Sequence, residues 1–254
     1  MSSPSRFTAH GIRFAEEIRG AFRSGDGDAV LRMAEAEVAR ARAAGDPAGE
    51  VEAIYAMSRL ALRAGDLSRG GELAAAALEV ALRSGDRRLE DRPRHVLAAV
   101  ARMSGEYLMA RELYLASIAL NEELGKPETV NSEYHNLAFT ELHLGNLDRA
   151  RELFAEGRVR VFREGYRSFV PYLGVAATAL AAAEGDHARA ATMIGFTDAA
   201  FAALHQVPDP DDAEELATAR TAAISALGPD TFDAAHAAGA ALDATTAFGR
   251  TWRN

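Results

Sequence analysis

A glycine recurs every 20 residues along most of this chain. The series runs through nine consecutive positions: Gly25, Gly45, Gly65, Gly85, Gly105, Gly125, Gly145, Gly165 and Gly185. Glycine enters the left-handed conformation that closes a helix without a steric penalty, so it marks helix C-termini. The spacing therefore predicts consecutive helices of about 16 or 17 residues, joined by connections of only a few residues.

Most of these glycines are followed by a residue that can cap the next helix, because an acidic or amide side chain accepts hydrogen bonds from first-turn N–H groups. Seven of the nine carry one: Asp26, Asp46, Asp66, Asp86, Glu106, Asn146 and Asp186. Composition agrees, since 56 of the 254 residues are alanine, the strongest helix former, and only 7% are aromatic. The sequence therefore predicts an all-α fold of antiparallel helices.

A second period of 40 residues groups the helices into hairpins. Small residues stand seven positions before alternate glycines, at Ser58, Ala98, Ala138 and Thr178. Small residues also stand five positions after the same glycines, at Gly70, Ala110, Ala150 and Ala190. Nine positions after these glycines the residues are mostly large: Ala74, Tyr114, Phe154 and Ile194. We expect the small residues to let the two helices of a hairpin approach closely, and the large ones to fill the space between hairpins.

This pattern resembles the tetratricopeptide repeat (TPR), in a long-helix variant common in bacterial signalling proteins. The best copies are HVLAAVARMSGEYLMARELYLAS (95–117) and YHNLAFTELHLGNLDRARELFAEG (134–157). The 40-residue period is longer than the basic TPR unit of about 34 residues. The resemblance covers residues 10–205 and implies a right-handed superhelical array of antiparallel hairpins with about 12 helices. It also implies a scaffold that holds a protein or peptide in a concave groove.

The C-terminal part resembles a different set of proteins. From about residue 186, the stretch RAATMIGFTDAAFAALHQVPDPDDAEELATARTAAISALGPDTFDAAHAAGAALD is similar to the helical end of large actinobacterial ATPase-type transcriptional regulators. No GxxxxGK[ST] motif or recognisable helix-turn-helix is present, so ATPase activity and operator binding do not carry over. We expect a repeat array over 1–206 and a helical cap over 207–254. Its helices should span about 211–227 and 230–247, after an acidic linker at 208–212.

Charge and cysteine content narrow the partners and the compartment. The 28 basic and 37 acidic residues give a net charge of −9, which makes nucleic acid an unlikely partner. There is no cysteine for a disulfide or thiolate site, and the first residues lack the apolar core of a signal peptide. The longest apolar stretch, 174–183, is about half a membrane span. We expect a cytoplasmic protein that does not enter membranes.

Motifs for catalysis or cofactor binding are missing from the sequence. It contains no HExxH, GxGxxG or GxSxG. His135 and His143 are eight residues apart, which separates them by about 12 Å along a helix, too far to share a metal ion. We therefore expect no metal, no cofactor and no enzymatic activity. An enzyme that uses the tyrosine, histidine and arginine side chains of the groove stays an alternative.

The candidate binding residues lie on the first helix of each hairpin, which lines the concave side of such an array. Outward-turned positions fall about 3, 6, 10 and 13 residues before each glycine, and acidic residues are nearly absent there. The candidate residues at or beside these positions are Tyr55, Arg59, Arg63, His95, Arg102, His135, Asn136, Phe139 and Tyr172. Arginine and histidine among aromatic residues favour an anionic or carboxylate-bearing ligand. Alternatively, these arginines pair with Glu52, Glu90 or Glu133 on neighbouring helices.

The functional hypothesis is a non-catalytic scaffold or sensor in a bacterial regulatory pathway. Its partner would be a protein or peptide segment, with acidic residues that the groove arginines bind. A regulator that senses a small molecule in an enclosed pocket is the second hypothesis.

Overall fold

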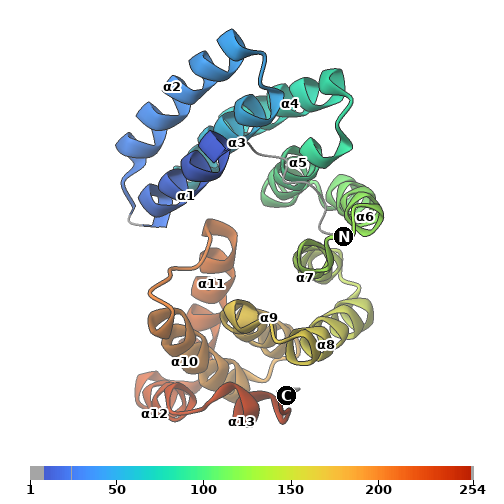
Figure 1. Cartoon of the computed structure of the whole chain (residues 1–254). Helices are drawn as coiled ribbons and strands as arrows, with labels where there is room; N and C mark the ends of the chain where they lie inside the picture. The colour runs from blue at the N-terminus through green and yellow to red at the C-terminus, as the bar shows by residue number, and fades with distance from the viewer. Residues whose placement is uncertain (1–8, 24, 253–254) are drawn as a thin grey trace. The chain divides into compact units, whose positions relative to one another are not determined.

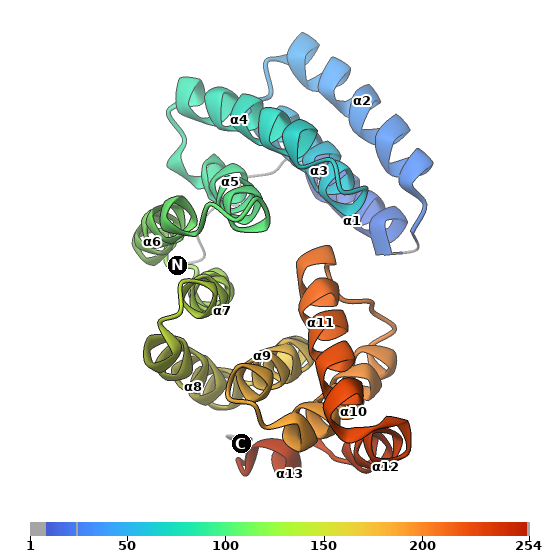
Figure 2. The same ribbon diagram turned by 180° about the vertical axis from the view of Figure 1, so that it is seen from behind.

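The computed structural model describes residues 9–23 and 25–252, and these residues form an all-α structure. They contain thirteen α-helices and two short 3₁₀ helices, and no strand occurs among them. The chain divides into two compact units, residues 1–126 (the N-terminal unit) and 127–254 (the C-terminal unit). Figures 1 and 2 show the helices of both units from two opposite sides.

The N-terminal unit holds six α-helices and one 3₁₀ helix. They are α1 (Ala9–Arg23), α2 (Gly27–Ala44), α3 (Pro47–Arg63), α4 (Leu67–Ser84), the 3₁₀ helix Arg87–Leu89, α5 (Asp91–Met103) and α6 (Tyr107–Glu123). Each helix packs against the next along the chain. The unit is therefore a series of consecutive hairpins.

The C-terminal unit holds the remaining helices. They are α7 (Pro127–His143), α8 (Leu147–Glu164), the 3₁₀ helix Arg167–Phe169, α9 (Val170–Ala183), α10 (His187–Ala203), α11 (Pro210–Leu227), α12 (Pro229–Ala240) and α13 (Ala244–Phe248). The expectation of one helix over 230–247 is wrong, because Asp243 accepts a hydrogen bond from the Thr246 N–H and starts a new helix. The acidic segment is also not purely a linker: α11 begins at Pro210, so Asp211 and Asp212 lie in its first turn.

The glycine series sets the helix ends as predicted. Every helix that precedes one of the nine glycines ends within two residues of it. All nine glycines have positive φ, between 62° and 80°. Three residues separate the two helices of each 40-residue hairpin, for example 64–66 between α3 and α4. The helical repeat predicted from the glycine spacing is confirmed.

The capping residues follow the prediction at most turns. Asp26, Asp46, Asp66 and Asp186 each accept a hydrogen bond from the N–H three residues further on, at 2.9–3.0 Å. Asp86 caps the 3₁₀ helix through the Arg88 N–H. Glu106 and Asn146 form no side-chain cap, so the prediction is wrong for them. The Asn146 amide instead donates to the Glu141 carboxylate at 2.8 Å.

The small residues of the 40-residue pattern bring the helices of each hairpin together. Ser58 on α3 donates a hydrogen bond from its hydroxyl to the Gly70 carbonyl on α4, at 2.7 Å. A Cβ at Gly70 would lie 2.7 Å from Leu62 Cδ2, so a larger residue here would require the Leu62 side chain to shift. The equivalent residues of the other hairpins, Ala98, Ala110, Ala138, Ala150, Thr178 and Ala190, are buried as well.

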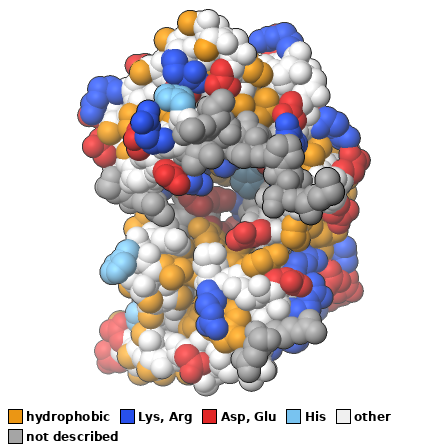
Figure 3. All heavy atoms as spheres, in the orientation of Figure 1, with side chains coloured by type: hydrophobic (Ala, Val, Ile, Leu, Met, Phe, Trp, Pro, Cys, Tyr) orange, Lys and Arg blue, Asp and Glu red, His pale blue; other side chains and the backbone are white. Residues whose placement is uncertain are grey.

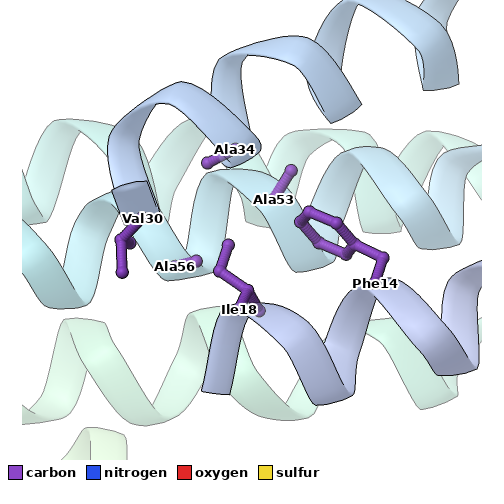
Figure 4. Packing of buried hydrophobic residues seen from close by; sticks show 6 residues of the cluster. All are labelled: Phe14, Ile18, Val30, Ala34, Ala53 and Ala56. Carbon is purple, nitrogen blue, oxygen red and sulfur yellow. The ribbon is translucent and has the colours of Figure 1, made fainter. Parts of the chain in front are cut away.

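Hydrophobic packing is local, within small groups of neighbouring helices. In the first group, side chains from α1 and α2 meet those of α3, as Figure 4 shows for Phe14, Ile18, Val30, Ala34, Ala53 and Ala56. A second cluster in the N-terminal unit joins Leu62, Ala74 and Val96 from α3, α4 and α5. Because each cluster draws on successive helices, every hairpin is stabilised by its neighbours in the sequence.

The last helices of the C-terminal unit cover the preceding hairpin. Helix α11 packs on α9 and α10, and α12 packs on α10. The α10–α12 contact is so close that a Cβ at Gly195 would lie 1.9 Å from the His236 carbonyl oxygen. The expected domain boundary at 206/207 falls inside this unit.

Beyond α12, the chain docks on α8. Trp252 stacks on Phe162, with ring centroids 4.4 Å apart and planes 28° apart. The Arg167 guanidinium lies 4.4 Å from the centroid of the Trp252 ring. Among the helices described, none combines the length and apolar character that crossing a bilayer requires.

Candidate functional site: an arginine–aromatic face

Three helices of the N-terminal unit contribute to a cluster of cationic and aromatic side chains. Phe22 comes from α1, Tyr55, Arg59 and Arg63 come from α3, and Arg92 comes from α5. We call these five residues the arginine–aromatic face. Three of the candidate residues, Tyr55, Arg59 and Arg63, belong to it, and each is half-buried.

Phe22 organises two of the guanidinium groups. The Arg63 guanidinium carbon lies 3.8 Å from the centroid of the Phe22 ring, and that of Arg59 lies 4.3 Å from it. Arg63 also donates a hydrogen bond from Nη1 to the Phe22 carbonyl oxygen at 2.8 Å. A cation over an aromatic face is attracted by the ring quadrupole, so Phe22 and its carbonyl restrict the orientation of Arg63.

Arg92 is paired within the unit. It forms an ion pair with Glu52, which is buried on α3, and its guanidinium carbon lies 5.0 Å from the Tyr55 ring centroid. Burial alone would lower the pKa of Arg92, but the negative charges of Glu52 and its neighbours hold that pKa above its ordinary value. Arg94 pairs with Glu90 in the same way, at 2.7 Å. The alternative of pairing with an acid on a neighbouring helix is confirmed for Arg92, whereas Arg94 pairs with a residue four positions earlier in the chain.

Arg63 differs from Arg92 in its partners. None of the described residues offers a carboxylate to Arg63, whose one hydrogen bond is to a backbone carbonyl. A guanidinium carries five N–H donors in a planar fork that matches a carboxylate or phosphate. The geometry therefore holds a cation in place while most of its donors stay available to an anionic group.

Two further candidates of the N-terminal unit lie on α5. His95 is half-buried. Arg102 is only 4% exposed, so the expectation that it lines an open wall is wrong. Arg102 stands three residues before its turn glycine, as Leu62 does in the previous hairpin, and Leu62 packs on Gly70 of the partner helix. That position faces into the hairpin, which explains the burial of Arg102.

The other candidates lie in the C-terminal unit, and three of them belong to an aromatic cluster. The His135 ring contacts Phe139, Phe169 and Tyr172 edge-on, with centroids 5.0, 5.2 and 6.2 Å away. Phe139 is fully buried and packs on Phe154 of α8, so its expected place on a binding surface is wrong. His135 is buried and Tyr172 half-buried.

Asn136, the last candidate, is half-buried on α7. The backbone carbonyl oxygen of Asn136 accepts a hydrogen bond from the Thr140 hydroxyl at 3.0 Å.

A group of arginines in the C-terminal unit was not among the predicted site residues. Arg158 of α8 and Arg189 of α10 line a pocket of about 200 Å³. A signal was present, because the residues three and four positions from Arg158 are Phe154, Ala155, Val161 and Phe162, all apolar. An arginine inside an apolar helical stripe has no acid on its own helix to pair with.

Charge elsewhere on the molecule is mixed. Acidic and basic side chains are interspersed over the face that Figure 3 shows. Many of them form exposed pairs one helical turn apart, such as Arg83 with Glu79 at 2.6 Å and Arg149 with Glu152 at 3.0 Å. Such pairs contribute little to stability and mark a solvated surface. Arg63 differs from the arginines of these pairs, because an aromatic ring and a backbone carbonyl hold its guanidinium group in place.

Comparison with known proteins supports the fold. No family model and no curated protein matches the sequence. Among solved structures, the crystal structure of BtubC (BKLC) from P. vanneervenii is similar, with a TM-score of 0.54. The two sequences are 22% identical over 85% of this chain and 93% of that one. At this level of identity, the likeness shows the fold alone.

Proposed function

We propose that this chain is a non-catalytic binding scaffold of the TPR type. It holds an acidic protein or peptide segment on its arginine–aromatic face and works in a bacterial regulatory pathway in the cytoplasm. The helical hairpin repeat supports the scaffold part of this proposal. His95, His135, Asn136 and Tyr172 stay predicted contact residues.

The observation that carries the proposal is the arrangement of Arg59 and Arg63 on Phe22. Both guanidinium groups lie within 4.3 Å of one ring centroid, on consecutive turns of α3. The guanidinium of Arg63, to which the described residues offer no carboxylate, has N–H donors available for an anionic side chain at this position. A peptide segment with acidic side chains a few ångströms apart can accept hydrogen bonds from these guanidinium groups, and we expect it to bind more tightly than a neutral segment.

A direct binding measurement tests the proposal. The probe is a fluorescein-labelled octapeptide of alternating glutamate and leucine, titrated with the full chain and followed by fluorescence anisotropy. Each charge-assisted hydrogen bond contributes about 1.5–3 kcal/mol. The double variant Arg59→Gln/Arg63→Gln should therefore bind the octapeptide more weakly by a factor of about a hundred or more. Affinity of the unaltered chain should fall as salt is raised.

The matched control is Arg69→Gln/Arg83→Gln, which removes two exposed, paired arginines of α4. It should bind as the unaltered chain does, and circular dichroism should show equal helicity in all three proteins. The proposal fails if the unaltered chain does not bind the octapeptide. Equal affinity of the Arg59→Gln/Arg63→Gln variant, or of a peptide with lysine in place of glutamate, contradicts it as well.

A further inference from the structure

The C-terminal unit contains a half-buried arginine, Arg158, for which the described residues provide no ion-pair partner. The Nε atom of Arg158 on α8 is buried and donates to no acceptor within residues 9–23 and 25–252. An N–H group that is buried without a partner destabilises the fold, and more so when it is charged. Arg158 as a whole is only half-buried, so its outer N–H groups can donate to an acceptor that a ligand supplies.

Two more arginines add their charge to that of Arg158. Arg189 lies on α10, and Arg250 follows α13. Arg189 and Arg250 are exposed, and within the part of the chain that the structure describes no carboxylate pairs with any of the three arginines. Burial, together with the positive charges of Arg250 and Arg189, lowers the pKa of the Arg158 guanidinium below its ordinary value. The three arginines thus leave a positive potential without an internal counterion.

A pocket of about 200 Å³ opens beside these charges. One part of its lining is apolar and comes from α8, α9 and α13: Phe154, Ala155, Leu173, Ala176, Ala177, Leu180 and Phe248. The polar lining is Arg158 and Arg189 together with Arg151 and Glu184. Glu184 is the one acid among these lining residues, and it accepts hydrogen bonds from Arg151 at 2.9 and 3.1 Å. It is therefore engaged by a different arginine and does not neutralise Arg158.

We propose that this pocket binds a small organic carboxylate that carries one compact apolar group. The carboxylate accepts hydrogen bonds from Arg158 and Arg189, and the apolar group packs against Phe154, Leu173 and Phe248. The small volume admits a single such group, and the apolar lining favours it over a bare inorganic ion. This site is independent of the arginine–aromatic face, because the two draw on residues of different units.

Calorimetric titration of the full chain with three probes tests the proposed chemistry. 3-Phenylpropanoate has both the charge and the apolar group, 3-phenylpropanamide has the shape without the charge, and acetate has the charge without the apolar group. We expect 3-phenylpropanoate to bind at least tenfold more tightly than either of the other two. If the unaltered chain does not bind 3-phenylpropanoate, or binds the acid no better than the amide or acetate, the proposal is overturned.

Two arginine variants on α8 locate the site. Arg158→Gln should weaken the binding of 3-phenylpropanoate at least tenfold, to the level of the amide, and leave binding of the amide unchanged. Arg149→Gln removes an exposed arginine of the same helix, paired with Glu152, and should change neither affinity. Circular dichroism checks that both variants keep the fold. An unchanged affinity of Arg158→Gln for the acid, or an equal loss in both variants, overturns the assignment.

Discussion

Glu37 is a buried carboxylate that ties together the first three helices. It is 5% exposed and accepts hydrogen bonds from Arg40 at 2.9 and 2.7 Å. The ring of His10 on α1 contacts it at 2.8 Å, and Arg40 also donates to Asp46, the cap of α3, at 2.5 Å. Burial by itself would raise the pKa of Glu37, but the hydrogen bonds and charges of Arg40 and His10 hold it below its ordinary value.

This pKa shift predicts an acid-sensitive contribution to stability. Because the folded-state pKa of Glu37 lies below the unfolded value of about 4.5, its contribution is complete above that pH and is lost as the pH falls through the folded pKa. Glu37→Gln should lower the free energy of unfolding at pH 7 by about 1.5–3 kcal/mol. Urea unfolding should show the difference from the unaltered chain shrinking below about pH 4.5.

A control for this prediction is Glu79→Gln, which removes an exposed carboxylate paired with Arg83. That variant should stay within about 0.5 kcal/mol of the unaltered chain at every pH. If the unaltered chain and Glu37→Gln lose stability in parallel between pH 7 and acid, Glu37 is not the titrating group.

Helical spacing predicted the burial of many single residues, but not their partners. Ala110 and Ala150 are buried where the 40-residue pattern placed them, because small residues recur at contacts between helices. Phe139 could not be assigned in this way. Whether an aromatic residue on α7 faces solvent or a neighbour depends on the side chain opposite, here Phe154 of α8.

At the scale of helices, their ends were the most predictable feature. A turn glycine with positive φ is a local requirement of the backbone, so the sequence displays it directly. The break after α12 was missed because the glycine nearest to it, Gly239, lies inside the helix and is not one of the positive-φ turn glycines. There, Asp243 accepts from the Thr246 N–H at 2.7 Å, a local hydrogen bond that competes with continuation of the helix.

The contact between α10 and α12 predicts a severe effect of adding one methyl group. A Cβ at Gly239 would lie 1.8 Å from the Thr192 carbonyl oxygen, which is backbone and has no rotamer to change. Gly239→Ala should therefore force the helices apart and lower the free energy of unfolding by about 3 kcal/mol or more. Thermal and urea unfolding measure the change.

A glycine-to-alanine substitution at a less crowded position should raise the free energy of unfolding instead of lowering it. Gly157 lies inside α8, and the nearest atom to its added Cβ would be 4.0 Å away. Gly157→Ala should raise stability by up to about 1 kcal/mol, because alanine is the better helix former. If Gly239→Ala is as well tolerated as Gly157→Ala, the two helices are not in such close contact.

On the scale of the molecule, the division into two units was not predictable. The glycine period continues unchanged through Gly125 and Gly145, so nothing in the sequence marks a boundary near residue 126. The expectation of a cap over 207–254 rested on the resemblance of the segment from about residue 186 to the helical end of other proteins. In the structure, this segment packs on α9 and α10.

Removal of residues 207–254 should expose apolar surface. Ala219 and Phe232 lie buried in this segment, and Ile194 and Phe196 lie buried on α10. Without the last helices, we expect the shortened chain to bind a hydrophobic dye with several-fold higher fluorescence and to aggregate in light scattering. A shortened chain that stays monomeric and binds no more dye than the full chain would show that the segment is a separate module.

The docking of Trp252 on Phe162 has a consequence for how the C-terminal unit folds. These residues are 90 positions apart (252 − 162), whereas the hairpin bond from Ser58 to Gly70 spans 12. Loop-closure entropy grows with the logarithm of loop length, so the longer closure costs about 2 kcal/mol more. Local hairpins therefore form early, and the tail docks once α8 and its neighbours are in place. The chain's single tryptophan thus reports on the final contact of that unit.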